Sequence, residues 1–342
     1  HYLYYHTLGS EQSADQVIFG GTAKPRRYVG ADLTEDERFL VITAANSTSG
    51  NELYIKDLHD AQSELLCLVD NFDKNHDVLC NVDDTLYIYT NLDAPNGRIV
   101  TANLAESLPS QWKDLIPETA DVLSPSTGAG KIFASYIRDA VSVVMQYGMD
   151  GQKEHEVALP GLGTASGFSG RREQQELYYT FTSYVYPPTI FKYIPATTSS
   201  VLYRKSGAQF DTESFTSTQV FYTSKDGTRV PMIITHKKGL ERNGKNPTVV
   251  YGYGGFNVSL TPGFSTSVVA LIEQGGVYAV ANLRGGGEYG EAWHVAGTKM
   301  QKQNVTVNIQ PTTPEIKIAA RIATGPRIAA SWVSSDMLCD GD

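Results

Sequence analysis

The sequence predicts a group of β-propeller blades followed by the first strands of an α/β sheet. Two observations carry this prediction. Short strand-like segments recur at near-equal intervals through the first 205 residues, which is typical of propeller blades. After residue 205 the pattern changes to strand, glycine-rich loop, helix and strand, which is the order of elements in an α/β sheet.

The repeat is marked by five strand-like segments, most of them followed by residues that favour turns. They begin at Leu3, Leu53, Ile99, Val144 and Ile190, and the starts are separated by 50, 46, 45 and 46 residues. A further strand-like segment precedes each of the last four, at Phe39–Thr43, Thr85–Tyr89, Lys131–Tyr136 and Glu176–Phe181. Several strands in each unit of about 45 residues predict about four blades and a leading strand.

The number of blades also bears on how the ring closes. A propeller closes so that each blade is covered by its neighbours. The chain opens on a strand with no blade before it, so we expect part of a larger ring. The alternative is a β-sandwich in which the spacing is coincidental, and the four near-equal intervals favour the propeller.

A β-hairpin is predicted where the second region begins. Val220–Ser224 and Thr228–Ile234 flank Lys225-Asp226-Gly227, and Asp-Gly is a typical hairpin turn. Pro231 in the second strand indicates a bulge or an edge position, because proline cannot donate to the ladder.

Two buried strands and a helix are expected next. Thr248–Tyr251 and Gly276–Asn282 are short apolar runs suited to buried strands, and Pro262–Gln274 is suited to a helix. A glycine cluster follows each strand, at Gly252–Gly255 and Gly285–Gly287. Because sites in such sheets lie at the carboxyl ends of strands, both clusters are candidate site loops.

Composition excludes several classes of function. The net charge of -9 is spread along the chain without a basic stripe, so we expect no nucleic-acid partner. No apolar run approaches the roughly 20 residues of a membrane span, so we expect no membrane partner. Cys67, Cys80 and Cys339 lack the spacing of metal ligands, and free thiols are favoured over a Cys67–Cys80 disulfide.

Between Phe221 and Val305 the sequence resembles the prolyl oligopeptidase family of serine peptidases. The matching segments are Phe221–Thr228, Tyr251–Asn257, Ala281–Gly290, Trp293-His294 and Lys302–Asn304, and upstream Leu3–Gly9 and Phe181–Ile190 resemble the family's propeller. The resemblance covers about residues 1–305. It implies the late blades of a seven-bladed propeller over residues 1–205 and the N-terminal part of an α/β-hydrolase domain over residues 206–305.

The resemblance also implies roles for two residues. In the family, the second tyrosine of Tyr-Gly-Tyr-Gly-Gly-Phe donates its hydroxyl to the oxyanion of acyl transfer, and that tyrosine is Tyr253 here. Phe256 matches an aromatic residue that lines the family's pocket for proline. From the residues alone, packing within a loop is the favoured interpretation of Tyr253, and core packing is an open alternative for Phe256.

Three other motifs resemble functional sites. Gly285–Gly290 fits the loose dinucleotide pattern Gly-x-Gly-x-x-Gly, but no clear helix pattern follows, so we expect no cofactor. Gly167-Phe168-Ser169-Gly170 is not a nucleophile turn, because Arg171 stands where the second glycine is required. His294 beside Trp293 is a tempting base, but the family's catalytic histidine follows the nucleophile, so we expect a structural role.

The expected function follows from what the family requires. The sequence contains no Gly-x-Ser-x-Gly turn, and the family's serine, aspartate and histidine have no counterpart. We therefore expect a fragment of a prolyl oligopeptidase-type serine endopeptidase, a monomer whose partners are short proline-containing peptides, without turnover on its own. The expected compartment is the cytoplasm, with the periplasm as the alternative.

Other interpretations stay open. Residues 306–342 are expected to be a divergent tail that arises from a frameshift, a mis-predicted gene boundary or a damaged copy, and a genuine diverged ending is the alternative. A non-enzymatic propeller that binds peptides or proteins is the second functional interpretation. The third is a half-enzyme completed by a second chain.

Overall fold

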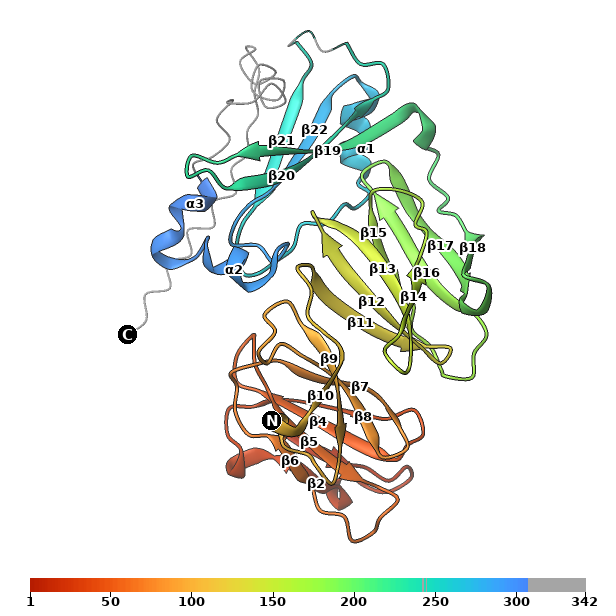
Figure 1. The fold of residues 1–342 in the computed structure, drawn as a ribbon, viewed down its shortest axis with the longest axis vertical. Helices are drawn as coiled ribbons and strands as arrows, with labels where there is room; N and C mark the ends of the chain where they lie inside the picture. The colour runs from red at the N-terminus through yellow and green to blue at the C-terminus, as the bar shows by residue number, and fades with distance from the viewer. Residues whose placement is uncertain (242, 244, 307–342) are drawn as a thin grey trace.

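The structure is a computed structural model that describes residues 1–241, 243 and 245–306 (Figure 1). Within these residues, four antiparallel sheets follow one another along the chain, each with four strands that pair in sequence order. A two-stranded antiparallel sheet, β1 (Tyr2–Tyr5) with β2 (Gln16–Gly20), precedes them. The four sheets are the blades that the repeat predicts.

Each blade spans roughly one repeat unit. The first two blades contain β3 (Tyr28–Leu33), β4 (Phe39–Ala45), β5 (Glu52–Asp57) and β6 (Leu66–Val69), then β7 (His76–Val82), β8 (Thr85–Thr90), β9 (Arg98–Asn103) and β10 (Lys113–Ile116). The last two contain β11 (Val122–Gly128), β12 (Lys131–Arg138), β13 (Val141–Gly148) and β14 (Lys153–Glu156), then β15 (Thr164–Gly167), β16 (Leu177–Ser183), β17 (Tyr186–Ile194) and β18 (Ser199–Arg204). The last four segments that mark the repeat are therefore the third strands of the blades, and the segments upstream of them are the second strands, while the segment at Leu3 forms β1 of the two-stranded sheet.

The apolar core lies between neighbouring blades. Leu53 of the first blade packs in one cluster with Leu86 and Val100 of the second. Ile99 of the second blade shares a cluster with Ile132 of the third, and Phe133 of the third packs with Phe181 of the fourth. A sandwich buries one pair of sheets against each other. Here four successive sheets each pack against the next, and this arrangement confirms the propeller.

A mixed sheet follows the propeller. Its strand order is β19 (Phe215–Thr223), β20 (Arg229–Lys237), β22 (Val277–Asn282) and β21 (Thr248–Tyr253). The first three strands are antiparallel neighbours, whereas β21 runs parallel to β22. Three helices lie in this region: α1 (Thr266–Glu273), α2 (Gly290–Val295) and α3 (Gln303–Thr306). This is the strand, loop, helix and strand order expected for the start of an α/β-hydrolase domain.

Two details of the mixed sheet differ from expectation. The segment Thr248–Tyr251 was expected to be buried, but Val249 is 38% and Tyr251 is 42% exposed, because β21 lies at the edge of the described sheet. Pro231 introduces no bulge, since the register of β19 and β20 is continuous. It lies one residue before the β20–β22 ladder begins at Met232, so its missing N–H removes no bond to β22.

The mixed sheet lies against one face of the propeller, above the blades in Figure 1. The turns between the second and third strands of three blades contact it. Asn96 of the second blade lies against Gly290, Asp139 of the third accepts a 2.6 Å hydrogen bond from the Tyr289 hydroxyl, and the ring of Tyr184 of the fourth lies 5.5 Å from that of Tyr278. These contacts fix which face of the propeller the candidate loops approach.

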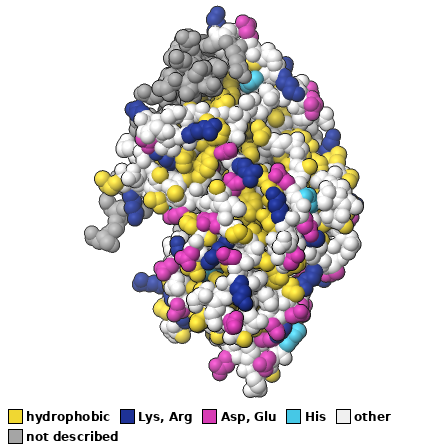
Figure 2. All heavy atoms as spheres, viewed as in Figure 1, with side chains coloured by type: hydrophobic (Ala, Val, Ile, Leu, Met, Phe, Trp, Pro, Cys, Tyr) yellow, Lys and Arg dark blue, Asp and Glu magenta, His cyan; other side chains and the backbone are white. Residues whose placement is uncertain are grey.

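The distribution of charged side chains on the visible face agrees with the sequence, in which charge is spread along the chain. Figure 2 shows acidic and basic side chains interspersed over the visible face. Among the described residues, no helix has the length and apolar character needed to cross a membrane. Cys67 and Cys80 are free thiols, as expected, while Cys339 lies outside the described residues.

Candidate active-site loops

Tyr253 is the last residue of β21, and its partner in the parallel ladder is Asn282 of β22. The side chain is half-buried. Its hydroxyl turns back over Gly255: a Cβ built at Gly255 would lie 3.6 Å from the hydroxyl and 3.7 Å from the Nζ of Lys302. No described residue forms a hydrogen bond with this hydroxyl. The O–H is therefore available to an acceptor that arrives at the end of the sheet.

The two glycine clusters interlock through their backbones. The Asn257 N–H donates to the Gly285 carbonyl at 3.1 Å. A Cβ at Gly254 would overlap the Arg284 carbonyl, and a Cβ at Gly285 would lie 2.6 Å from the Gly254 carbonyl. Such close approach requires glycine. A short helix, α2, does follow the second cluster. Its glycines, however, contact residues 253–260, which we call the tyrosine loop, and this argues against a dinucleotide site.

Phe256 lies at the tip of the tyrosine loop. It is 81% exposed, so the core-packing interpretation is wrong. Both Phe256 and Asn257 have positive φ angles, 53° and 57°, a region that side chains with a Cβ rarely adopt. Strained backbone of this kind is concentrated at functional loops. The ring stands in solvent at the mouth of the loop, where a ligand can reach it.

Arg284 joins the hairpin turn to the glycine clusters. Its guanidinium is buried and forms an ion pair with Asp226, and it donates to the Ser224 hydroxyl at 2.8 Å and to the Thr228 hydroxyl at 3.1 Å. The hydrogen bond from Arg284 holds the pKa of Asp226 well below its ordinary value. The sequence identified Asp226 only as a turn residue, because nothing in the local pattern links it to an arginine 58 residues away.

His294 takes part in the packing of the loops. Its Nδ1 lies 2.8 Å from the Gly285 carbonyl and 3.1 Å from the Asn257 amide nitrogen. Among the described residues, no serine and no carboxylate is hydrogen-bonded to the ring. Ser169 follows β15 in a turn between the first and second strands of its blade, so it lies on the propeller face away from the mixed sheet. Neither residue meets the tyrosine loop as a nucleophile or as a base would.

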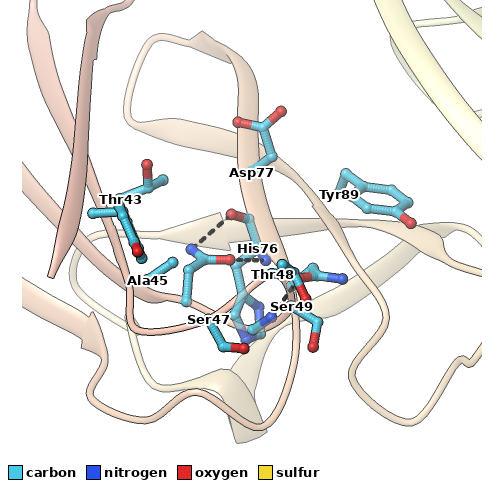
Figure 3. A pocket seen from close by; sticks show the side chains of 12 residues that line it. Thr43, Ala45, Ser47, Thr48, Ser49, His76, Asp77 and Tyr89 are labelled. Carbon is cyan, nitrogen blue, oxygen red and sulfur yellow. Dashed lines mark hydrogen bonds between the residues drawn. The ribbon is translucent and has the colours of Figure 1, made fainter. Parts of the chain in front are cut away.

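A cavity of about 350 Å³ lies between the first and second blades (Figure 3). Its walls include the turn Ser47–Gly50, together with His76, Asp77 and Tyr89. Burial lowers the pKa of His76 to about 4, and its Nδ1 lies 2.9 Å from the Thr90 hydroxyl, so the ring is neutral near pH 7. Burial raises the pKa of Asp77, with the nearby Asp32 as a second cause. This cavity could not be anticipated from the sequence, because its lining comes from different blades.

The cavity turn occupies the same position in its blade as the three turns that contact the mixed sheet. Ser47–Gly50 connects the second and third strands of the first blade. The cavity therefore opens on the propeller face that the candidate loops approach.

Comparison with known proteins gives a consistent result. A family model described as the prolyl oligopeptidase N-terminal β-propeller domain matches residues 1–206. A second, described as the prolyl oligopeptidase family, matches residues 262–313. The second match extends beyond residue 305, where the resemblance identified in the sequence ends. The prolyl endopeptidase of Elizabethkingia meningoseptica is 51% identical over 305 residues, which are 89% of this chain and 43% of that protein. The prolyl endopeptidase of Dictyostelium discoideum is 31% identical over 88% of this chain and 43% of its own length.

Solved structures show the same likeness. One from a study of two prolyl endopeptidases has a TM-score of 0.80 at 39% identity and covers 88% of this chain and 44% of its own. Prolyl oligopeptidase B of Galerina marginata, bound to a 35mer hydrolysis and macrocyclization substrate, has a TM-score of 0.81 at 29% identity and covers 94% of this chain and 46% of its own. The chain thus spans less than half the length of these relatives.

Proposed function

Because this chain belongs to the prolyl oligopeptidase family, we propose that it supplies the propeller and the oxyanion side of a serine endopeptidase that cleaves short peptides after proline. The observation that carries the proposal is the position of Tyr253: at the carboxyl end of a strand, with its hydroxyl unbonded among the described residues. Sites in α/β sheets lie at this end of the strands. The identity to prolyl endopeptidases over 89% of the chain supports the same activity.

In the proposed reaction, a serine attacks the carbonyl carbon of the proline, a histidine takes the serine proton and passes it to the leaving amine, and an aspartate orients the histidine. The negative charge then collects on the former carbonyl oxygen. The Tyr253 hydroxyl donates to that oxygen, and a backbone N–H beside the nucleophile is the second donor. Phe256 offers a flat apolar face to the proline ring. The 342-residue sequence holds no Gly-x-Ser-x-Gly nucleophile turn, so we propose that these residues alone do not turn over a substrate.

We further propose a propeller over residues 1–205, part of the hydrolase domain over residues 206–305, and a monomeric state. Residues 307–342 lie outside the described residues, and their assignment as a divergent tail stays a prediction. Static light scattering on the purified chain tests the monomer.

A chimera tests the proposed function most directly. Residues 1–305 would replace the matching 305 residues of the Elizabethkingia meningoseptica enzyme, which supplies the remainder. We expect cleavage of a Gly-Pro reporter that a serine-directed phosphonate abolishes. Tyr253→Phe should then lower kcat by about 10²–10³-fold, the usual effect of removing one oxyanion donor. Tyr251→Phe is the matched control on the same strand and should change kcat less than about threefold.

Two results would contradict the proposal. One is a folded chimera without cleavage after proline. The other is equal loss of kcat in the two tyrosine variants, which would assign Tyr253 no special part in the chemistry. Turnover of the reporter by the 342-residue chain alone, blocked by the phosphonate, would refute the proposed inactivity of that polypeptide.

A further inference from the structure

Both ends of the tyrosine loop, residues 253–260, are attached to one residue of β22. Tyr253 is the ladder partner of Asn282, and the Asn282 side-chain amide donates to the Leu260 carbonyl at 2.7 Å. The loop therefore leaves the sheet beside the backbone of Asn282 and is bonded to the side chain of the same residue where it returns. Asn282 is buried, so water does not compete for this bond.

A buried carboxyl group completes the attachment. Glu288 is fully buried, and its Oε1 accepts from the Leu260 N–H at 2.8 Å and from the Asn282 side-chain amide at 3.1 Å. Leu260 is thus held through both its N–H and its carbonyl. Two further side chains bond to the loop backbone nearer its start: the Lys302 Nζ donates to the Gly254 carbonyl at 2.9 Å, and the Asn257 N–H lies 3.1 Å from the His294 Nδ1.

The packing around the loop explains why polar bonds are needed there. Gly286 lies against the Val258 carbonyl and Gly287 against the Asn257 carbonyl, and neither glycine offers an apolar side chain to hold the loop. At the end of the loop the Leu260 side chain packs against the apolar cluster of Tyr184, Ile233 and Val280. Because apolar contact is not directional, the hydrogen bonds from Asn282 and Glu288 can fix the backbone position that this packing leaves open.

We propose that Glu288 and Asn282 are positioning residues that hold the Tyr253 hydroxyl in place by fixing Leu260 at the base of its loop. This inference rests on the proposed role of Tyr253. It is also supported by two buried oxygens, Glu288 Oε2 and Asn282 Oδ1, that have no hydrogen-bond partner among the described residues. A buried polar atom without a partner is unfavourable, and such groups are retained where the fold requires the position of the side chain.

Burial raises the pKa of Glu288, which favours the neutral acid in the folded protein. Glutamine has the size of a neutral glutamic acid and keeps a carbonyl oxygen in place of Oε1. Glu288→Gln therefore tests whether the acceptor alone suffices, and Glu288→Ala removes it.

The experiment uses the 342-residue chain without substrate. Hydrogen exchange measures protection of the Leu260 amide, and 3-fluorotyrosine at position 253 reports the surroundings of the ring by ¹⁹F NMR. In Glu288→Ala we expect at least about tenfold faster exchange at Leu260 and a shifted fluorine resonance, with the Val269 amide of α1 unchanged. Glu288→Gln should restore both readouts. Glu291→Ala, which changes an exposed glutamate in α2, is the matched control and should alter neither.

A folded Glu288→Ala variant with an unchanged Leu260 amide or fluorine resonance would overturn the inference. Should that variant fail to fold, Asn282→Ala removes the donor to the Leu260 carbonyl and carries the same expectation. Global unfolding of both alanine variants would indicate a general stabilising role and would also overturn it. None of these readouts needs catalysis, so an inactive chimera would contradict the proposed function and leave this test intact.

Discussion

The propeller and the mixed sheet keep their loops in place by different means. In the propeller, large side chains such as Phe133 and Phe181 fill the space between blades. In the mixed sheet, the loops beside Tyr253 are glycine-rich and are held by polar side chains, among them Arg284 and Glu288. Apolar burial is roughly proportional to area and is not directional, whereas hydrogen bonds fix positions. The scaffold is therefore built for stability, and the candidate site for geometry.

The largest effect on stability is expected in the apolar core between the propeller blades. Phe133→Ala should lower the free energy of unfolding by about 3–5 kcal/mol, because it leaves a cavity between the third and fourth blades. Phe133 is fully buried and lies against the rings of Phe168 and Tyr193. Urea denaturation followed by circular dichroism measures the change. Val201→Ala on the exposed strand β18 is the control and should stay within about 0.5 kcal/mol; equal effects would contradict the inter-blade core.

The next largest effect on stability is expected at the contact between the propeller and the mixed-sheet region. A Cβ at Gly290 would overlap Asn96 of the second blade, and Gly290 has a φ of +75°. Gly290→Ala should therefore cost about 1–3 kcal/mol by overpacking. Gly263→Ala is the matched control, because nothing lies within 4 Å of its Cβ position. If the two variants melt alike in calorimetry, the two regions do not meet at Asn96.

Asp226→Asn tests the polar attachment of the hairpin. The variant leaves the buried Arg284 guanidinium without its counter-charge, but the Asp226 side chain is 42% exposed, so solvent screening reduces the loss to about 1–2 kcal/mol. The pKa of Asp226 is lower when folded. Its contribution is therefore present above the unfolded pKa and is lost as pH falls below about 3.9. Unfolding measured from pH 3 to 7 should show less acid dependence in the variant; identical pH profiles would contradict the ion pair.

Glu288 should have the opposite pH dependence. Because its pKa is raised in the folded protein, its contribution is complete below the unfolded value of 4.5 and is lost as pH rises through the folded value. Thermal unfolding across this window should show stability falling with pH in the wild type, and the fall should be smaller in Glu288→Gln. A pH profile that the substitution leaves unchanged would show that the carboxyl ionises equally in both states.

The smallest effect is expected at the sheet edge. Val249 on β21 is 38% exposed, so Val249→Ala should cost less than about 1 kcal/mol. Val280→Ala on the central strand β22, where the side chain is buried, should cost distinctly more. Equal losses by urea denaturation would show that β21 is covered in solution.

The sequence predicted the blades better than it predicted the site. The blade strands were located because each blade is a local meander and its third strand repeats at a nearly constant spacing. Tyr253 and Phe256 were proposed as site residues only through the family resemblance, and their roles stay predictions. Arg284, Asn282 and Glu288 were not assigned roles, because their partners lie in other turns or on backbone atoms and leave no periodic signal. The exposure of β21 was missed because an apolar run looks the same at the edge and at the centre of a sheet.

The strand order of the mixed sheet also determines when it can assemble during synthesis. Each blade can complete its hydrogen bonding soon after its last strand leaves the ribosome. The edge strand β21 cannot, because its neighbour β22 is made later and has to enter between it and the hairpin. While residues 254–282 are translated, β21 remains unpaired beside four blades that are already complete. In that interval a nascent chain of this kind most needs a chaperone.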